Sequence, residues 1–309
     1  MKSAKDEIFE ILKKLTYDVG ISGYEDNIRG MVIDELKNYA DSLEVDSLGN
    51  VIAVKKGSKS SKKLMIAAHM DERGFLKFAP VGGITERTLL GQKVKIITKD
   101  NKIIKGVIGL KPPHIMKPEE AKQVPDFSDL YIDIGFFSKD EVLKNGIDIG
   151  SIVSFDRELE RIGNGDIVTG KSLDDRAGLA AMIQEEVGLK GAKVSAFRVE
   201  PDIAIALDVT IASDVPSIPE GSWVCKLNQG PAIKLIDGQK GTGLIANKKL
   251  VDFVTNVANK YNVPYQLEVL TGGTTDASAM NLNKEGVPSI AISIPARYIH
   301  SPVEVVSLN

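Results

Sequence analysis

The sequence predicts an α/β protein built on a doubly wound sheet, with a second, β-rich domain inserted into it. Two observations lead to this fold class. Before residue 74 and after residue 168, apolar strand-like segments alternate with amphipathic helical segments, as in a mostly parallel sheet with helices on both faces. Between residues 74 and 168, short β-rich runs are separated by Gly, Pro, Asn and Asp, with little helical periodicity. That middle region predicts an inserted small β-barrel or β-sandwich.

The individual elements follow from the spacing of apolar residues. A helix is expected over 3–15, because Ile8, Leu12 and Leu15 belong to one apolar stripe at three- and four-residue spacing. The same periodicity and the turn residues between segments give the remaining elements. Helices are expected over 28–36, from 174 onward and over 248–261, and strands over 51–54, 63–68, 203–209, 266–270 and 289–294.

Length and composition exclude several classes of protein. A chain of 309 residues with a net charge of −3 is long enough for two domains and is a poor candidate for nucleic-acid or anionic-membrane binding. The single cysteine, Cys225, forms no internal disulfide and cannot make a zinc finger. The charged, amphipathic N-terminus does not resemble a signal segment, and no apolar stretch is long enough to span a membrane. We therefore expect a cytoplasmic, globular protein.

Candidate metal ligands gather where strands and helices meet. His69 ends an apolar strand, Asp208 ends another, and His300 follows a third. Two acidic pairs accompany them, Asp174 with Asp175 and Glu185 with Glu186. Imidazoles and carboxylates on one rim of a sheet suit two divalent ions such as Zn²⁺, Co²⁺ or Mn²⁺.

Each of these residues also has an ordinary structural interpretation. A strand-end histidine usually satisfies a hydrogen bond, and Asp208 could cap a turn. Asp174 and Asp175 could form a helix N-cap, and Glu185 and Glu186 a solvated helix face. Only their joint placement indicates a metal site. His114 lies in the β-rich region without acidic neighbours and is expected to be structural.

Six segments, in order along nearly the whole chain, resemble the tetrahedral (TET) aminopeptidases of metallopeptidase family 42. They are AAHMDERGF (67–75), GKSLDDRAG (170–178), EEVGLKGA (185–192), PDIAIALDVTIASDVP (201–216), GGTTDA (272–277) and ARYIHSPVEVV (296–306). The resemblance implies a phosphorylase/hydrolase-like domain with a doubly wound mixed sheet over 1–73 and 169–309. It also implies an inserted PDZ-like β-barrel over 74–168 that drives dimerisation and assembly, commonly into dodecamers.

The resemblance also assigns roles residue by residue. Asp174 would bridge two metal ions, with His69 and Asp208 completing one ion's coordination and Glu186 and His300 the other's. Glu185 would be the general base, because its neighbour binds metal while its own carboxylate stays free to take a proton. Asp71 would hydrogen-bond the far nitrogen of His69 and fix its tautomer. The substrate's first side chain would meet a wall formed by Gly272, Gly273, Thr274 and Asp276, although a plain glycine turn is an equally simple interpretation.

One region departs from the family pattern. Glu186 follows Asp174 by only twelve residues, too few for the helix and strand expected there, so roughly twenty residues appear absent. Either the printed sequence omits them between Ile183 and Gln184, or the protein is shortened; the first is favoured, because losing a central strand would expose the core. An ordinary ~3.8 Å Cα–Cα distance across that bond would exclude it. The family also continues into a helix after Asn309.

The function that these observations favour is a dinuclear metalloaminopeptidase that removes N-terminal residues from short peptides. A deacylase on the same scaffold, an endoglucanase of the kind some relatives are labelled, and an inactive assembly shell are the alternatives. A glycan hydrolase needs two free carboxylates across a sugar, whereas here the acids accompany two histidines in a ligand pattern.

Overall fold

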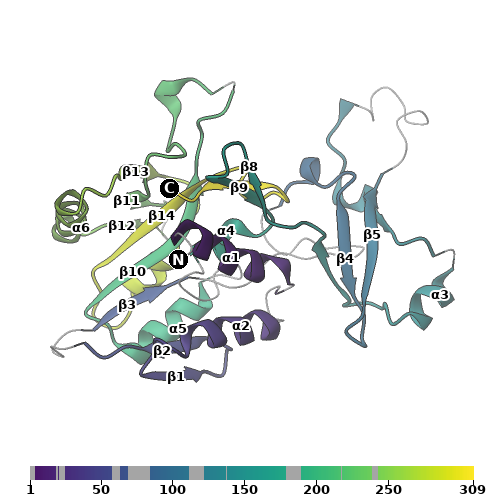
Figure 1. Ribbon diagram of the computed structural model, residues 1–309, viewed down its shortest axis with the longest axis horizontal. Helices are drawn as coiled ribbons and strands as arrows, with labels where there is room; N and C mark the ends of the chain where they lie inside the picture. Colours follow the sequence, from purple (N-terminus) through teal and green to yellow (C-terminus); the bar gives the residue numbers. More distant parts are fainter. Residues whose placement is uncertain are drawn as a thin grey trace.

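The computed structural model describes residues 4–18, 20, 25–57, 63–68, 84–110, 122–136, 138–178, 189–216, 218–238 and 243–309, and the structural statements below concern these residues. They form a mixed α/β fold with three sheets of two, nine and four strands. Figure 1 shows the nine-stranded sheet with its helices on the left and the four-stranded sheet on the right. The α/β class expected from the sequence is thus confirmed.

The large sheet carries the strands that position the candidate site. Its order is β12-β11-β14-β15-β9-β8, with β10 pairing β14 and β3, and β13 pairing β11. The strands are β3 (Leu64–Ala67), β8 (Glu160–Ile162), β9 (Ile167–Gly170), β10 (Ile203–Ile211), β11 (Ala232–Asp237), β12 (Leu244–Ile245), β13 (Gln266–Leu270), β14 (Ser289–Arg297) and β15 (Glu304–Ser307).

Strand direction differs from the sequence-based expectation. Strand β10 is parallel to β3 and β14, and β11 is parallel to β13. The other described pairs of this sheet are antiparallel, so the sheet is mixed, as the family resemblance implied, and not mostly parallel as the alternation of strands and helices had indicated. The apolar pattern of a strand does not encode its direction, and short connections such as the one from β14 to β15 return the chain antiparallel.

Helices cover both faces of the large sheet. On one face, α5 (Lys190–Val199) and α7 (Asp276–Asn281) pack on small residues such as Ala204 and Ala206. On the other face, α6 (Lys248–Lys260) packs on Ile233 and Ile290, and α1 (Ala4–Tyr17) packs near Val209. Asn247 caps α6 by accepting from the Lys249 N–H at 3.0 Å. Alanines on one face let the helices approach the sheet closely.

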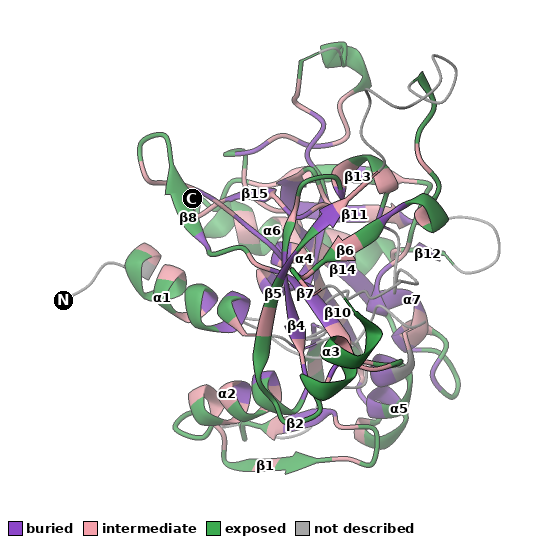
Figure 2. Ribbon diagram, turned by 90° about the vertical axis from the view of Figure 1, so that its right-hand side faces the viewer, coloured by how far each residue is buried: buried purple, intermediate pink, exposed green. Residues whose placement is uncertain are grey.

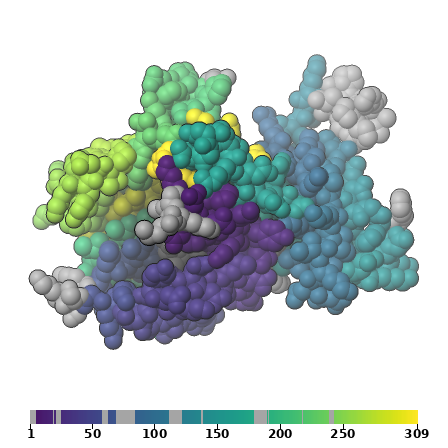
Figure 3. Space-filling model, viewed as in Figure 1, coloured from purple at the N-terminus to yellow at the C-terminus, as the bar shows by residue number. Residues whose placement is uncertain are grey.

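The N-terminal part adds a small layer. Helix α2 (Asp26–Leu36) packs its buried Ile28 and Val32 against β2 (Val51–Val54), which pairs antiparallel with β1 (Ser42–Val45). The outer strand β1 is largely exposed, as Figure 2 shows. In the space-filling view α1 and α2 lie side by side on one face of the molecule (Figure 3).

The β-rich region forms an open sheet. Strands β4 (Lys93–Ile97), β5 (Ile103–Gly109), β6 (Tyr131–Asp133) and β7 (Ile152–Phe155) pair antiparallel in the order β6-β5-β4-β7, with α3 (Lys139–Lys144) nearby in sequence. Their core contains the fully buried Val94, Ile96 and Val153. No closed barrel is present among the described residues, so the expected barrel is not confirmed. Strand β8, although it precedes residue 168, pairs with β9 in the large sheet.

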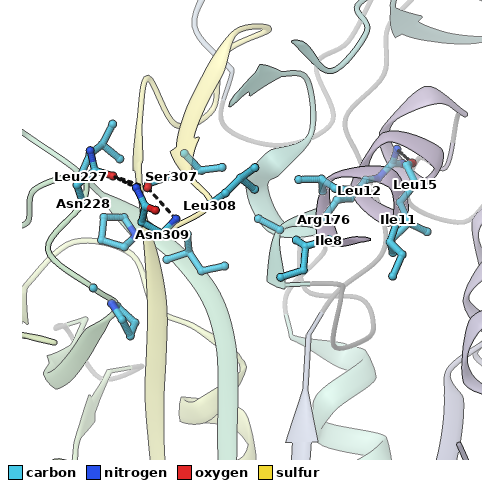
Figure 4. A pocket seen from close by; sticks show the side chains of 16 residues that line it. Ile8, Ile11, Leu12, Leu15, Arg176, Leu227, Asn228, Ser307, Leu308 and Asn309 are labelled. Atoms are coloured by element: carbon cyan, nitrogen blue, oxygen red, sulfur yellow. Dashed lines mark hydrogen bonds between the residues drawn. The ribbon is translucent and has the colours of Figure 1, made fainter. Parts of the chain in front are cut away.

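An apolar pocket of about 320 Å³ lies between α1 and the C-terminal residues. Figure 4 shows Ile8, Leu12 and Leu15 of α1 on one side and Leu308 on the other. Among the described predicted ligands, Asp174, Asp208 and His300 do not line the pocket, whereas Arg176, two residues after Asp174, does. Among the described residues, no helix combines the length and hydrophobicity needed to span a membrane.

Candidate active site

Two predicted ligands come together where strands β9 and β14 of the large sheet end. The Nε2 atom of His300 lies 3.1 Å from Oδ2 of Asp174. Asp174 belongs to the short helix α4 (Leu173–Arg176), which follows β9, whereas His300 lies in the turn between β14 and β15. The Asp174 side chain is 9% exposed and that of His300 is 43% exposed. A buried carboxylate thus faces an imidazole that solvent and ligands can reach.

Glu304, which the sequence did not single out, holds these two residues in place. Its Oε2 accepts the backbone N–H of Asp174 at 2.9 Å, and its Oε1 accepts the backbone N–H of His300 at 2.9 Å. Glu304 is 2% exposed and is the first residue of β15. We call Glu304 and these two N–H groups the Glu304 clamp. One carboxylate thereby fixes two segments that are far apart in the chain.

The Glu304 carboxyl has an unusual electrostatic environment. Burial, and then the negative charge of Asp174, raise its pKa to about 8. Hydrogen bonds from the backbone N–H groups of Asp174, His300 and Leu173 act in the opposite direction. A buried carboxylate in such a place requires nearby positive charge or donors to remain ionised at neutral pH.

Buried cations support the Asp174 segment from behind. Arg176 is fully buried and donates from Nη1 to the backbone oxygens of Leu15 and Asp18, at 2.6 and 3.1 Å. Lys171 also donates to the Asp18 oxygen, at 3.3 Å. These carbonyls lie at the C-terminal end of α1, where helix carbonyls lack intrahelical partners and attract cations. The contacts tie α1 to the segment that carries Asp174.

An ion pair between Arg297 and Asp214 orients the turn that carries His300. Arg297, at the end of β14, donates two hydrogen bonds to Asp214, at 3.1 and 2.6 Å. A paired guanidinium–carboxylate contact fixes direction as well as distance. Both Tyr298 and His300 have positive φ angles, 59° and 65°, so the chain turns sharply after Arg297. That turn brings His300 back toward Asp174.

Asp208 lies inside its strand rather than at its end. Strand β10 continues to Ile211, and Asp208 pairs in register with Ser293 of β14. The strand is longer than the expected 203–209 because Thr210 and Ile211 continue the parallel pairing with β14. The Asp208 side chain is 8% exposed, and its Oδ1 accepts the Val209 N–H at 2.8 Å. It is a buried carboxylate of the central strand.

The other predicted catalytic and metal-binding residues lie outside the described residues. These are His69, Asp71, Glu185 and Glu186; His114 and the Ile183–Gln184 junction also lie outside them. Within the part of the chain that the structure describes, no group of three or more His, Cys, Asp or Glu side chains gathers as a metal site. The structure therefore brings Asp174 and His300 together and leaves the remaining ligands as predictions.

The geometry of the described pair fits a divalent ion. Ligands about 2.0–2.2 Å from a tetrahedral Zn²⁺ lie roughly 3.3–3.6 Å from each other, as an imidazole nitrogen and a carboxylate oxygen would. The His300–Asp174 separation of 3.1 Å is that of a direct hydrogen bond and slightly shorter than this spacing, so the two side chains would move apart by a few tenths of an ångström on binding an ion. An imidazole with a carboxylate is also the donor set that Zn²⁺ and Co²⁺ accept. The residues present fit a metal ion.

The predicted substrate wall occupies the loop before α7. Gly272 and Gly273 are exposed and Thr274 is half-buried, so these three residues face outward. Asp276 is 3% exposed and lies in the first turn of α7, behind the N-cap residue Thr275. The loop can contact a ligand through its glycines, whereas Asp276 lies beneath that surface.

The sequence profile of the M42 glutamyl aminopeptidase family matches residues 49–184 and 179–309 of this chain. The chain belongs to this family. It is therefore an aminopeptidase, a peptidase hydrolase of a family of metallopeptidases. The resemblance noted in the sequence is confirmed.

Three similar proteins show how far the likeness extends. A putative aminopeptidase of Acetivibrio thermocellus is 40% identical, with 99% of this chain and 95% of the relative covered. The structure of an aminopeptidase from the archaeon Desulfurococcus kamchatkensis is 46% identical, with a TM-score of 0.94 and coverage of 99% and 91%. The TET1 peptidase of Pyrococcus horikoshii, described as assembling into a tetrahedron or a large octahedral shell, is 36% identical, with a TM-score of 0.81 and coverage of 98% and 95%.

The alignments also bear on the short segment after Asp174. The match to the Acetivibrio relative extends over 334 residues, more than the 309 of this chain, so the relative has residues that this chain lacks. The two stretches of the family match meet at residues 179–184. That is where the sequence has about twenty residues fewer than the family pattern. Because residues 179–188 are outside the described part, the Cα–Cα distance across Ile183 and Gln184 stays untested.

The sequence contains one signal for Glu304. In the run PVEVV, Glu304 is the only charged residue between apolar neighbours, at the start of a strand. A charged side chain at such a position is seldom buried unless it has partners. Its two partners, the backbone N–H groups of Asp174 and His300, come from distant segments and become evident only in three dimensions.

Proposed function

We propose that this M42 peptidase is a dinuclear metal-dependent aminopeptidase that hydrolyses the N-terminal residue of short peptides. The observation that carries the proposal is the His300–Asp174 pair, 3.1 Å apart and held by Glu304. Membership of a metallopeptidase family supports it further. Asp174 would bridge two ions, with His69 and Asp208 as ligands of one and Glu186 and His300 as ligands of the other.

The residues of the chain would then have separate roles in the reaction. Glu185 would take the proton of the attacking water and return it to the leaving amine. Asp71 would accept from the far ring N–H of His69 and so fix its tautomer. Gly272, Gly273, Thr274 and Asp276 would form the wall beside the first substrate side chain. Two divalent ions, when bound, would polarise the scissile carbonyl and lower the pKa of water.

The metal would be Zn²⁺ or Co²⁺, with Mn²⁺ as a third candidate. Nitrogen and carboxylate ligands accept all three ions, so affinity alone does not select among them. We propose a cytoplasmic location, which agrees with a single cysteine that is buried and free.

We also propose that residues 74–168 form an inserted, PDZ-like dimerisation domain, with 1–73 and 169–309 as the catalytic domain. The open sheet β4–β7 would be its structural centre, while β8 pairs into the large sheet. Dimers formed through this domain would assemble into a dodecamer. The Pyrococcus horikoshii TET1 peptidase, which can assemble into a tetrahedron or a large octahedral shell, supports this proposal. Light scattering of the purified protein would measure the assembly directly.

A metal-reconstitution assay tests the proposed activity. Chelator-treated protein is expected to lose hydrolysis of leucyl-p-nitroanilide and to regain it with Zn²⁺, Co²⁺ or Mn²⁺, at two ions per subunit. N-Acetyl-leucyl-p-nitroanilide is the matched control, because it lacks the free amine. The Glu185→Gln variant is expected to bind metal and to lose most of its activity.

Three outcomes would redirect the assignment. Preferred hydrolysis of the acetylated substrate would indicate a deacylase. Cleavage of a cellulosic substrate by metal-free protein would indicate a glycan hydrolase. Failure to bind metal, with Glu185→Gln indistinguishable from the wild type, would indicate an inactive assembly shell.

A further inference from the structure

A buried carboxylate at the end of β11 holds the loop that precedes α7. Oδ2 of Asp237 accepts both the backbone N–H and the hydroxyl of Thr275, at 2.9 and 2.6 Å. The hydroxyl of Thr274 donates to the Asp237 backbone oxygen at 3.1 Å. Asp237 is 1% exposed, so water does not compete for these contacts. Three hydrogen bonds therefore connect one residue to two neighbouring positions of the loop.

The residue after Asp237 brings the same loop into close contact. Gly238 has a φ of +84°, and a Cβ placed on it would lie 2.3 Å from the Gly273 oxygen. Its N–H donates to the Leu270 oxygen at 2.8 Å. Glycine is required here both by the backbone conformation and by the approach of the loop. Gly273 of the predicted substrate wall thus lies directly against the end of β11.

Lys234 provides the positive charge for this carboxylate. Its Nζ donates to Oδ1 of Asp237 at 3.1 Å, and its side chain is 3% exposed. Burial lowers the pKa of Lys234, but the negative charges of Asp237, Glu268 and Asp208 outweigh burial and raise it. The negative charge of Asp208, a predicted metal ligand, therefore also contributes to the raised pKa of Lys234. We call Lys234, Asp237, Glu268 and Thr275 the Asp237 cluster.

We propose that Asp237 is a positioning residue that sets substrate selectivity by fixing the wall at Gly272, Gly273 and Thr274, with Lys234 as its counter-ion. This inference rests on the proposed aminopeptidase function. The outward-facing part of the wall consists of two glycines and a threonine, which have little rigidity of their own, while Asp276 lies beneath them. Asp237 supplies that rigidity through Thr275, so the wall keeps a fixed distance from the first side chain of the substrate. Pocket selectivity between side chains of different size depends on such fixed contacts.

The test compares two substrates in two matched variants. In Thr275→Val the hydroxyl bond to Asp237 is lost while size is kept, and in Thr275→Ser the hydroxyl is retained. We expect Thr275→Val to raise KM for leucyl-p-nitroanilide about tenfold more than KM for the alanyl substrate, with kcat changed less than about threefold. Thr275→Ser is expected to restore the wild-type selectivity. Asp237→Asn is expected to act in the same direction as Thr275→Val.

Metal content separates this proposal from a general structural effect. Zn²⁺ bound per subunit, measured by elemental analysis, is expected to be unchanged in Thr275→Val and Asp237→Asn. Equal changes in KM for both substrates, or loss of metal together with kcat, would overturn the proposal. Lys248→Met, which removes an exposed ion pair with Asp252, is the matched surface control. If the wild type itself cleaves no aminoacyl substrate, the proposed function fails instead.

Discussion

Two buried carboxylates connect distant segments of this M42 peptidase, and they do so in different electrostatic settings. Glu304 accepts the N–H groups of Asp174 and His300, and among the described residues it has no ion pair with Lys or Arg. Asp237 accepts from Thr275 and has a buried ammonium, Lys234, at 3.1 Å. The Glu304 clamp lies beside predicted metal ligands, and the Asp237 cluster supports the predicted substrate wall.

Charge is balanced by different means in these two regions. The Asp237 cluster contains its own cation, so its stability depends on keeping both members of the pair. The Glu304 clamp uses backbone donors, and the pKa of Glu304 is raised by burial and by Asp174. We therefore expect substitutions in the Asp237 cluster to affect mainly stability and selectivity, and those in the Glu304 clamp to affect mainly metal binding.

The largest effect is expected from Lys234→Met. Removing the ammonium leaves the carboxylate of Asp237 buried without its counter-ion, and breaking a buried pair in this way costs roughly 3–5 kcal/mol. The double variant Lys234→Met/Asp237→Asn is expected to be more stable than Lys234→Met, because it removes the unpaired charge. Chemical denaturation followed by circular dichroism measures the free energy of unfolding of each protein.

The surface lysine Lys248 provides the comparison for that experiment. It lies 2.6 Å from Asp252 on α6, and its side chain is 85% exposed. Lys248→Met is expected to change the free energy of unfolding by less than about 1 kcal/mol, as exposed pairs contribute little. A cost for Lys234→Met as small as that for Lys248→Met would show that the Asp237 cluster does not depend on its cation.

A smaller and different effect is expected from Glu304→Gln. The amide oxygen can accept one of the two N–H groups, but the amide nitrogen faces the other as a second donor. Asp174 and His300 then lose their fixed separation. Groups that orient metal ligands typically change metal affinity by about 10–100-fold, and we expect a loss in that range. Isothermal titration of chelator-treated protein with Zn²⁺ measures it.

An exposed glutamate is the control for Glu304→Gln. Glu220 lies 2.9 Å from Lys226, and its side chain is 74% exposed, so Glu220→Gln is expected to leave Zn²⁺ affinity unchanged. If Glu304→Gln also leaves the affinity unchanged, the clamp is not needed to hold the ligands. The expectation that Glu304, unlike Asp237, acts mainly on metal binding would then be wrong.

The elements of the fold were largely predictable, but the partners of its buried charges were not. Apolar periodicity located β13 and α6 to within one residue, because each buries one regular face, and it placed the starts of β10 and β14 correctly but ended these strands two and three residues early. Strand direction and barrel closure depend on pairing between distant segments, which the periodicity of a single segment does not contain. The expected barrel and the mostly parallel sheet therefore did not match the described strands.

The candidate site shows the same division. Asp174 and His300 were predicted as ligands from the resemblance to a family, and the structure brings them together. Glu304, Lys234 and Glu268 were visible only as charged residues inside apolar strand sequences such as AIKLID and QLEVL. Their partners lie on other strands or loops, so the sequence indicates that such charges need partners without indicating which residues these are.

At neutral pH the smallest effect is expected for Cys225, a buried thiol whose pKa is shifted by charges of the Asp237 cluster. Burial, and then the negative charge of Glu268, raise its pKa from 9.0 to about 12, while Lys234 acts in the opposite direction. In the unfolded chain the thiol ionises near pH 9.0, so above that pH the unfolded state loses a proton that the folded state keeps. The free energy of unfolding therefore falls as pH rises between about 9 and 12.

A Cys225→Ala variant lacks this contribution, so its stability relative to the wild type is expected to improve steadily above pH 9. In a Glu268→Gln background the improvement is expected to be smaller, because one source of the raised pKa is gone. An improvement that is the same in both backgrounds would show that burial alone raises the thiol pKa and that the charges of the Asp237 cluster balance one another at Cys225.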